Sequence, residues 1–313
     1  MKVKRAVVVG SINMDIILRV DKIPKIGETK IAEKMKISGG GKGANQAIAI
    51  SRMGCSVSMI GKIGNDRFGR NLIDSLKASR VDIEGVIVDE FNETGTAYVT
   101  VDCIGENTIV VVPGSNSCLS IKDIDEKKEI ICDSDIVILQ MEIPVSIISY
   151  VMNLAKELGR LVILNFAPAL DIDFDILHKV DFLILNEIEM LLIAELKHLR
   201  KIERDTINEA IKRIRNKFDR NIIITLGSNG CIWINEKGNI LEIPAFPVKS
   251  IDSTGSGDAF VGGFVCGLLR GNSIKNSLKI GNAAGGLAVT KIGAQSSLPY
   301  WGDVESLMSN YTL

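Results

Sequence analysis

A short segment near the carboxyl end combines a carboxylate with a run of small residues. Residues 252–258 read DSTGSGD, and the apolar stretch AFVGGFVCGLL follows. We expect Gly255, Ser256 and Gly257 to lead into a helix whose positive end, with its outward N–H groups, forms an anion site. Asp258 in the first turn could simply cap that helix. A carboxylate beside an anion site more economically indicates phosphoryl transfer, with Asp258 accepting the proton of the attacking hydroxyl.

A second glycine cluster, SGGGKGAN at 38–45, precedes an expected helix at Gln46–Met53. Its glycines allow a ligand to approach the backbone closely and allow positive φ. Lys42 adds a charge, and Asn45 adds a group that both donates and accepts hydrogen bonds. A P-loop would need Gly-Lys-Ser/Thr after a buried strand, but Gly43 follows Lys42. A merely tight turn into a helix is the other alternative, and it leaves the lysine and asparagine unexplained. The cluster therefore indicates a ligand-binding loop.

Composition excludes several other kinds of chemistry. Only two histidines occur, His178 and His198, and both lie in charged, helical surroundings typical of a surface. Triad mechanisms and histidine-rich metal sites are therefore disfavoured. The cysteines lack C-x-x-C spacing, which removes support for zinc or thioredoxin-like sites, and we expect them to be scattered buried thiols. They stand at positions 55, 103, 118, 132, 231 and 266.

Charge and hydropathy bound the partners and the compartment. The net charge of −1 over 313 residues argues against nucleic acid and membrane surfaces as partners. No apolar stretch approaches the ~18 residues of a transmembrane helix. The amino-terminal apolar run, AVVV, is too short for a signal peptide. We therefore expect a cytoplasmic protein with no nucleic-acid or membrane partner.

Short apolar runs alternate with helical patterns and predict the elements that position these motifs. Helices are expected at Val145–Leu158 and Asp205–Phe218. The runs are typical of parallel strands covered on both faces. The alternation predicts an α/β fold, a doubly wound and mostly parallel sheet flanked by helices. The expected strands are Arg5–Gly10, Ser56–Ile60, Asp135–Leu139, Leu161–Asn165, Asp181–Leu185 and Asn221–Thr225.

Two segments, 12–37 and 94–112, break this alternation. They read as strands without intervening helices, and DCIGEN at 102–107 has hairpin chemistry around Gly105. We expect them to pair as a small sheet that forms a lid over the site. Because the lid consists of two inserts, residues 1–313 are expected to form a single domain.

Three motifs in order resemble the phosphofructokinase-B family of carbohydrate and nucleoside kinases, and within it the ribokinases. They are GSINMD at 10–15, GGKGAN at 40–45 and DSTGSGDAF at 252–260. The resemblance covers essentially the whole chain. Smaller matches are IGEN at 104–107, LQMEIP at 139–144, LNFAPA at 164–169, NEIE at 186–189, TLGSNG at 225–230 and TKIGAQSS at 290–297. The departures are Ser256, where many ribokinases have alanine, and Phe166, which replaces a common proline.

The resemblance implies a role for each matching residue. It makes Asp258 the catalytic base and Gly255, Ser256 and Gly257 the anion hole. The residues implied to bind the sugar are Asn13, Met14, Asp15, Gly40, Gly41, Lys42, Gly43, Ala44, Asn45 and Glu142, with Asp258. Those implied to bind the nucleotide are Asn186, Thr225, Leu226, Gly227, Ser228, Asn229, Gly230, Gly257 and Asn282.

The resemblance also implies two metal ions and an assembly. Glu189 would help organise Mg²⁺ through water, beside ATP. A K⁺ site would be formed by Asp252, Thr254, Ala288, Lys291, Gly293 and Ser297. A homodimer in which two lids pair would cover their open strand edges.

The implied activity is phosphorylation of D-ribose by ATP at the 5-hydroxyl, giving ribose 5-phosphate and ADP. One alternative is another sugar or nucleoside kinase of the family, for deoxyribose or pseudouridine. A non-catalytic sugar sensor is a further alternative, although the intact GSGD segment argues against it.

Overall fold

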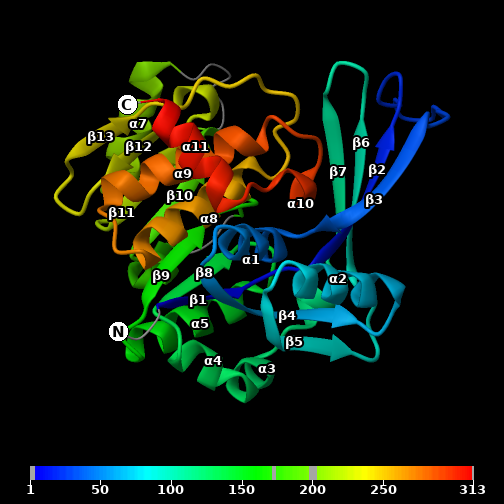
Figure 1. Ribbon diagram of the computed structural model, residues 1–313, viewed down its shortest axis with the longest axis horizontal. Coiled ribbons are helices and arrows are strands. Elements are labelled where there is room, and N and C mark those ends of the chain that lie inside the picture. The colour runs from blue at the N-terminus through cyan, green and yellow to red at the C-terminus, as the bar shows by residue number, and fades with distance from the viewer. Residues whose placement is uncertain (1–3, 171–173, 197–202, 312–313) are drawn as a thin grey trace.

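The computed structural model describes residues 4–170, 174–196 and 203–311, and a nine-stranded sheet forms its centre (Figure 1). The strand order is β13-β12-β11-β10-β9-β8-β1-β4-β5. All neighbouring strands from β11 to β5 are parallel, and β12 and β13 are antiparallel at one edge. This confirms the predicted fold class. The strands are β1 (Arg5–Val9), β4 (Ser56–Gly64), β5 (Asp82–Asp89), β8 (Ile136–Gln140), β9 (Leu161–Asn165), β10 (Phe182–Asn186), β11 (Asn221–Thr225), β12 (Cys231–Ile234) and β13 (Ile240–Ile243).

All six predicted strands are confirmed, because each is buried on both faces. The bounds of β1, β8 and β10 differ from the prediction by one residue, and β4 continues to Gly64. The sequence did not predict β5, β12 and β13. They occupy the two edges of the sheet, where polar and partly exposed residues interrupt the apolar run of β5 and of β13.

Helices cover both faces of this sheet and define two cores. Along β1, Val8 packs into the core with α1, α2, α8, α9 and α11, whereas Val7 and Val9 pack into the core with α3 to α7. The first group is α1 (Lys42–Arg52), α2 (Arg67–Ala78), α8 (Ser256–Leu269), α9 (Ile274–Ala288) and α11 (Trp301–Asn310). The second is α3 (Ile121–Glu126), α4 (Lys128–Cys132), α5 (Val145–Glu157), α6 (Glu187–Ile193) and α7 (Arg204–Arg215). Within the described ranges, no helix is long and apolar enough to cross a membrane.

The two helices predicted between strands are confirmed as α5 and α7. Helix α7 ends at Arg215, so Phe218 lies beyond it and packs into the core as part of the following turn. His178 is exposed on a short 3₁₀ helix (Phe174–Lys179), as expected, and His198 lies outside the described residues. All six cysteines are free thiols, but only Cys231 and Cys266 are buried, and Cys103 is exposed on the hairpin.

A separate four-stranded sheet confirms that the segments at 12–37 and 94–112 pair. Figure 1 shows it as a twisted ribbon that projects from the core. Its order is β3-β2-β6-β7, with β2 and β6 parallel although they are far apart in the chain. Gly105, with φ of 88°, turns the hairpin between β6 and β7. The strands are β2 (Asn13–Arg19), β3 (Lys34–Gly40), β6 (Gly95–Val101) and β7 (Asn107–Val112).

Glycines on α8 let this helix pack closely against two neighbours. A Cβ at Gly262 would lie 2.5 Å from Ala49 Cβ on α1. On the side facing α9, a Cβ at Gly267 would lie 2.6 Å from Cα, Cβ and Oγ of Ser277. These distances are shorter than the contacts that real Cβ atoms make, so the three helices depend on glycine for their spacing.

We therefore predict that Gly267→Ala lowers the free energy of unfolding by about 1–3 kcal/mol, since overpacking forces α8 and α9 apart. Gly302→Ala on α11 is the matched control, because a Cβ there meets nothing within 4 Å. Alanine at that helical position should be neutral or stabilising by about 0.5–1 kcal/mol. Urea unfolding of the two variants measures the difference, and equal effects would contradict the packing argument.

Candidate active site

The polar residues of the predicted site gather at the carboxyl edge of the large sheet. Ser11 follows β1, Glu142 follows β8, and Asn165, Asn186 and Thr225 end β9, β10 and β11. The sheet extends in opposite directions on either side of β1, through β4 and through β8. Ligands of open α/β sheets bind outside the carboxyl ends of the strands at such a reversal of strand order. The topology therefore indicates where a ligand would lie.

The glycine cluster at 38–45 differs from the loop that the sequence predicted. It runs directly from the exposed strand β3 into α1, which begins at Lys42 rather than Gln46. Gly41 precedes the helix with φ of 83°. A Cβ at Gly43 would lie 2.7 Å from the backbone N and O of Ser11, so only glycine lets the first turn of α1 contact β1. Lys42 and Asn45 therefore project from a helix rather than a loop.

Asp258 lies in the first turn of α8 and is buried. Its Oδ2 accepts a hydrogen bond from Asn45 Nδ2 at 2.9 Å, and its Oδ1 accepts one from Gln46 Nε2 at 3.0 Å. It makes no capping bond to its own helix. The hydrogen bonds that hold the carboxylate therefore come from side chains of α1.

Asp258 belongs to a cluster of four interacting charged side chains. They are Asp15 from β2, Lys42 from α1, Glu142 after β8, and Asp258 itself. Burial raises the pKa of Asp258, although Lys42, Asn45 and Gln46 oppose the change. Burial lowers the pKa of the Lys42 ammonium, but the surrounding carboxylates outweigh it and the pKa is raised. The site therefore holds one cation among several carboxylates.

Asp15 has a strongly perturbed carboxyl group. Burial, followed by the charges of Glu142 and Asp258, raises its pKa to about 7, while Lys42 opposes this. A Cβ at Gly40 would lie 2.2 Å from both carboxylate oxygens of Asp15, so glycine is needed beside it. Asp15 is therefore a partly buried carboxyl group that lies among other carboxylates, with Lys42 as its counter-charge.

The side-chain amides of Asn13 and Asn45 differ in the atoms that they leave free for a ligand. Asn116 Nδ2, on a 3₁₀ helix (Gly114–Cys118), donates to Asn13 Oδ1 at 2.7 Å, which leaves Asn13 with N–H donors. Asn45 uses its Nδ2 on Asp258, and its buried Oδ1 has no partner in the described part of the chain. Glu142 accepts from Ser11 Oγ and, at 3.0 Å, from Lys42 N. This group of side chains therefore presents both donors and acceptors, as a polyol would require.

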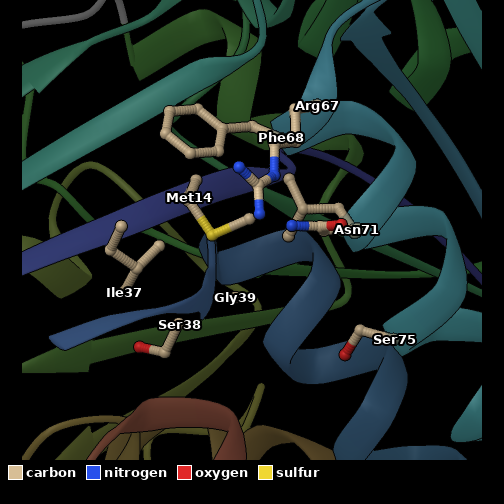
Figure 2. Close-up of a pocket in the computed structure, with 9 residues that line it drawn as sticks. Met14, Ile37, Ser38, Gly39, Arg67, Phe68, Asn71 and Ser75 are labelled. Atoms are coloured by element: carbon tan, nitrogen blue, oxygen red, sulfur yellow. The ribbon is translucent and has the colours of Figure 1, made fainter.

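Met14 does not share the face of β2 that carries Asn13 and Asp15. Figure 2 shows it with Ile37 beside a cavity of about 390 Å³ between the small sheet and α2. Arg67, Phe68 and Asn71 of α2 line the same cavity. Because alternate residues of a strand point to opposite faces, the Met14 side chain is directed away from the pocket that holds Asp15. Only its backbone is available on the side of the predicted sugar.

A larger cavity of about 520 Å³ is lined at the start of α8 by Ser256 and Gly257, the two residues before Asp258. It collects six residues predicted to bind the nucleotide, and Leu226, Asn229 and Asn186 do not line it. The six are Thr225, Gly227, Ser228, Gly230, Gly257 and Asn282. Asn282 Nδ2 donates to the carbonyls of Ile243 and Pro244, both at 3.0 Å, so this amide also fixes the cavity wall. The loop from Ala245 to Val248 contributes lining that the motifs did not reveal.

The three residues predicted to form an anion site lie at the start of α8. Gly255 has φ of 76° and precedes the helix, and Ser256 and Gly257 line the larger cavity. The Ser256 N–H already donates to Ser253 O at 3.2 Å, so it is less available than the sequence suggested. The amides of Gly255 and Gly257 remain the better candidates for an anion.

The acidic residue predicted near magnesium is committed to a helix start. Glu189 accepts from Asn186 N at 2.7 Å and from Asn186 Nδ2 at 2.9 Å, forming a capping box on α6. Burial raises its pKa, against the Asn186 amide and Lys42. Among the described residues, no group of three His, Cys, Asp or Glu side chains could hold a metal. This donor set fits an ion that is bound mostly by phosphate and water, and not one held by a protein cage.

The two segments predicted to bind K⁺ lie side by side. Asp252 accepts from Thr254 N and Oγ1, as in the simple turn that is the alternative interpretation, and also from Gly293 N at 2.8 Å. Ser297 Oγ donates to Ala294 O. Ala288 is buried, and Lys291 is exposed and could contribute only its carbonyl. Carbonyl and hydroxyl oxygens from two adjoining loops fit a large monovalent cation.

Comparison with known proteins places the chain. Residues 3–301 match the pfkB family of carbohydrate kinases, and the chain belongs to that family. It is 34% identical over 296 residues to a ribokinase of Haemophilus influenzae, covering 95% of each chain. It is 32% identical to a deoxyribokinase of Salmonella typhi, covering 93% of this chain and 94% of the relative. The structure of Arabidopsis thaliana ribokinase complexed with ribose and ATP matches with a TM-score of 0.88 and 30% identity, covering 97% of this chain and 98% of the other.

Several polar residues of the site had no predicted role, although three of them lie within the motifs GSINMD, LQMEIP and LNFAPA. They are Ser11, Gln46, Asn116, Gln140 and Asn165. Three of them stand at or just after the carboxyl end of a predicted buried strand, which is the position where α/β sites form. That placement was readable from the sequence. The role of Asn116 was not, because its partners lie about 100 residues away.

The raised pKa of Asp15 predicts a pH-dependent cost in stability. The carboxyl group ionises near its ordinary pKa of 3.8 in the unfolded chain, whereas in the folded protein burial raises that pKa to about 7. The wild-type protein therefore loses stability as the pH rises between these values. Asp15→Asn removes this loss, so its stability advantage should grow by roughly 2–3 kcal/mol from pH 5 to pH 8. Urea unfolding of both proteins at the two pH values tests this, and a pH-independent difference would contradict it.

Proposed function

We propose that this chain is a sugar kinase that transfers the γ-phosphoryl group of ATP to the 5-hydroxyl of D-ribose, giving ribose 5-phosphate and ADP. One observation carries the proposal. Gly257 lines a cavity large enough for part of a nucleotide, and the next residue, Asp258, is hydrogen-bonded by the helix that bears Lys42 and Asn45. A buried base therefore separates a polyol pocket from a nucleotide cavity.

The chemistry follows from this position. The ribose O5 attacks the γ-phosphorus, a new O5–P bond forms, and the bond to the ADP oxygen breaks. Asp258 accepts the proton of the 5-hydroxyl as the O–P bond forms. The N–H groups of Gly255 and Gly257 stabilise the charge on the transferring group, with Ser256 in a lesser part. Lys42, with its raised pKa, remains a cation that balances this charge.

The sugar pocket suits a molecule with several hydroxyl groups. Asp15 and Glu142 accept hydroxyl protons, Asn13 donates, and the unpartnered Oδ1 of Asn45 accepts. Gly40, Gly41, Gly43 and Ala44 leave room for the sugar against the backbone, and Met14 contributes its main chain. The relatives that act on ribose support this substrate. The deoxyribokinase relative keeps deoxyribose as the second candidate.

Two ions complete the proposal. Mg²⁺ supplies neutralisation of the phosphate charge when ATP is bound, and Asn186 and Glu189 would meet its water shell. K⁺ would be held by the oxygens of Asp252, Thr254 and the loop through Gly293. The nucleotide itself would occupy the cavity lined by Thr225, Gly227, Ser228 and Gly230, with Leu226 and Asn229 shaping that loop, and Asn282 opposite.

The small sheet is proposed as a lid on a single domain, and as the surface of a homodimer. Strand β7 is exposed along its whole length, and Ile109, Val110, Val111 and Val112 on it are 46–65% exposed. An apolar edge strand of this kind is normally covered. A second copy of the chain would cover it through the same strands. Because the reaction consumes ATP, a cytoplasmic location remains part of the proposal.

A coupled assay of ADP release tests the substrate. Ribose should give the highest kcat/KM among ribose, deoxyribose, other pentoses, hexoses and pseudouridine. Asp258→Asn is the matched variant, because it keeps the size of the side chain and removes the proton acceptor. It should lower kcat by about 10²–10⁴-fold while ATP still binds.

Each possible outcome of this assay tests a different part of the proposal. A variant within threefold of the wild-type kcat would remove Asp258 as the base. A higher kcat/KM for deoxyribose or pseudouridine would replace the substrate but not the reaction. No turnover with any substrate in the panel, together with ribose binding by calorimetry, would favour a sugar sensor.

Potassium should activate the enzyme several-fold over sodium or tetramethylammonium. An ion between the loops of Asp252 and Gly293 would fix the path of the Gly255–Gly257 backbone before the phosphoryl group arrives, and such preorganisation favours electrostatic catalysis. The rates are measured at fixed ionic strength and saturating magnesium, with only the chloride salt changed. Identical rates in the three salts at every ribose concentration would show that Asp252 serves only as a turn residue.

A further inference from the structure

A chain of buried amides lies behind Asp258, and neither sugar nor nucleotide chemistry explains it. Gln46 and Gln140 are both fully buried. Gln140 Nε2, at the end of β8, donates to Gln46 Oε1 at 2.7 Å. Gln46 Nε2 then donates to Asp258 Oδ1 and to Asn165 Oδ1, both at 3.0 Å. Strands β8 and β9 thus hold the Gln46 amide of α1, and Gln46 alone of the three contacts Asp258 Oδ1.

Only one orientation of the Gln46 amide satisfies these contacts. Asn165 donates through its Nδ2 to Ile184 O, so its Oδ1 must face Gln46. Asp258 is an acceptor when ionised, and Gln140 presents a donor. If the Gln46 amide were turned over, its oxygen would oppose the oxygens of Asp258 and Asn165. Its nitrogen would oppose the nitrogen of Gln140.

The backbone has been shaped around this chain of amides. A Cβ at Gly10 would lie 2.0 Å from Gln140 Oε1, so glycine after β1 leaves the space that Gln140 fills. Gln46 and Gln140 do not line the nucleotide cavity. Burying two glutamines inside an α/β core is unfavourable unless their hydrogen bonds are made. Both polar atoms of the Gln46 amide are bonded, whereas Gln140 Oε1 has no partner among the described residues, so the bond to Gln46 is the contact that the Gln140 side chain makes.

We propose that Gln46 is a positioning residue that Gln140 holds in one orientation, and that it fixes the plane of the Asp258 carboxylate and keeps that carboxylate ionised. The inference rests on the proposed role of Asp258 as a base. These two glutamines would favour the ionised form of Asp258 whether or not a substrate is bound.

The charges around Asp258 explain why a hydrogen bond from Gln46 is needed. Lys42 on α1 is the cation that favours the ionised form of Asp258, and Asn45 donates to its second oxygen. Against them stand burial and the carboxylates of Glu142 and Asp15, and Lys42 is shared with Glu189. The pKa of Asp258 is already raised by burial, so loss of the Gln46 donor must raise it further.

The test compares Gln46→Met and Gln140→Met with the wild-type protein. Methionine keeps the length of the side chain and removes the amide. The carboxyl ¹³C resonance of Asp258, assigned by its absence in Asp258→Asn, is titrated in each protein. The midpoint should rise by about one to two pH units in Gln46→Met, as expected for one lost hydrogen bond to a charged group. It should rise less in Gln140→Met, and the acidic limb of kcat/KM for the sugar should follow.

Asn221→Leu is the control. Asn221 is a buried amide at the opposite end of β11, bonded to Trp233 Nε1, and its loss should reduce stability without moving the Asp258 midpoint. An unchanged midpoint in Gln46→Met would overturn the proposal, and one unchanged only in Gln140→Met would overturn the orienting role of Gln140. If Gln46→Met does not fold, the titration of Gln140→Met decides. A wild-type protein without kinase activity would refute the proposed function, and the resonance titration would still judge this inference.

Discussion

The burial of one carboxylate is the constraint on which this structure depends. Asp258 is removed from water at the start of α8, where burial favours its protonated form and raises its pKa. Its ionised form requires donors that are fixed in advance, and these come from Asn45 and Gln46 on a different helix. The first turns of helices α1 and α8 must therefore lie side by side, at a fixed distance from each other.

The packing of the core meets this requirement. Gly262 brings α8 against Ala49 of α1, and Gly43 brings the first turn of α1 against β1. The glycines of α8 thus do more than save space, since they bring Asp258 within reach of two side-chain amides. The same approach places Ser256 and Gly257 at the wall of the larger cavity. The close contact between α1 and α8 therefore determines the packing of the core, the hydrogen bonds to Asp258 and the position of the residues that line the larger cavity.

Local patterns were enough to predict the central fold and the outline of the site. The six central strands are apolar on both faces, so each produced a continuous signal, whereas β5 and β13 at the edges alternate with polar residues. The GSGD and GGKGAN segments predicted an anion site and a base because their residue types are adjacent in the chain. The start of α1 was misplaced because a run of glycines usually indicates a loop. Gln140, Asn165 and Asn116 could not be assigned from neighbours, since each acts on a residue roughly 100 or more positions away.

The residues of the site come from two separate sheets, and this affects which of them can change during evolution. Asn13 and Asp15 belong to a ribbon that stands apart from the main core, whereas Asp258 and its amides are embedded between helices and the large sheet. Substitutions along β2 can alter the polarity offered to a hydroxylated ligand without disturbing the packing of α1 on α8. Substitutions around Asp258 disturb both together. Ligand preference is therefore free to drift while the phosphoryl-transfer step is held fixed.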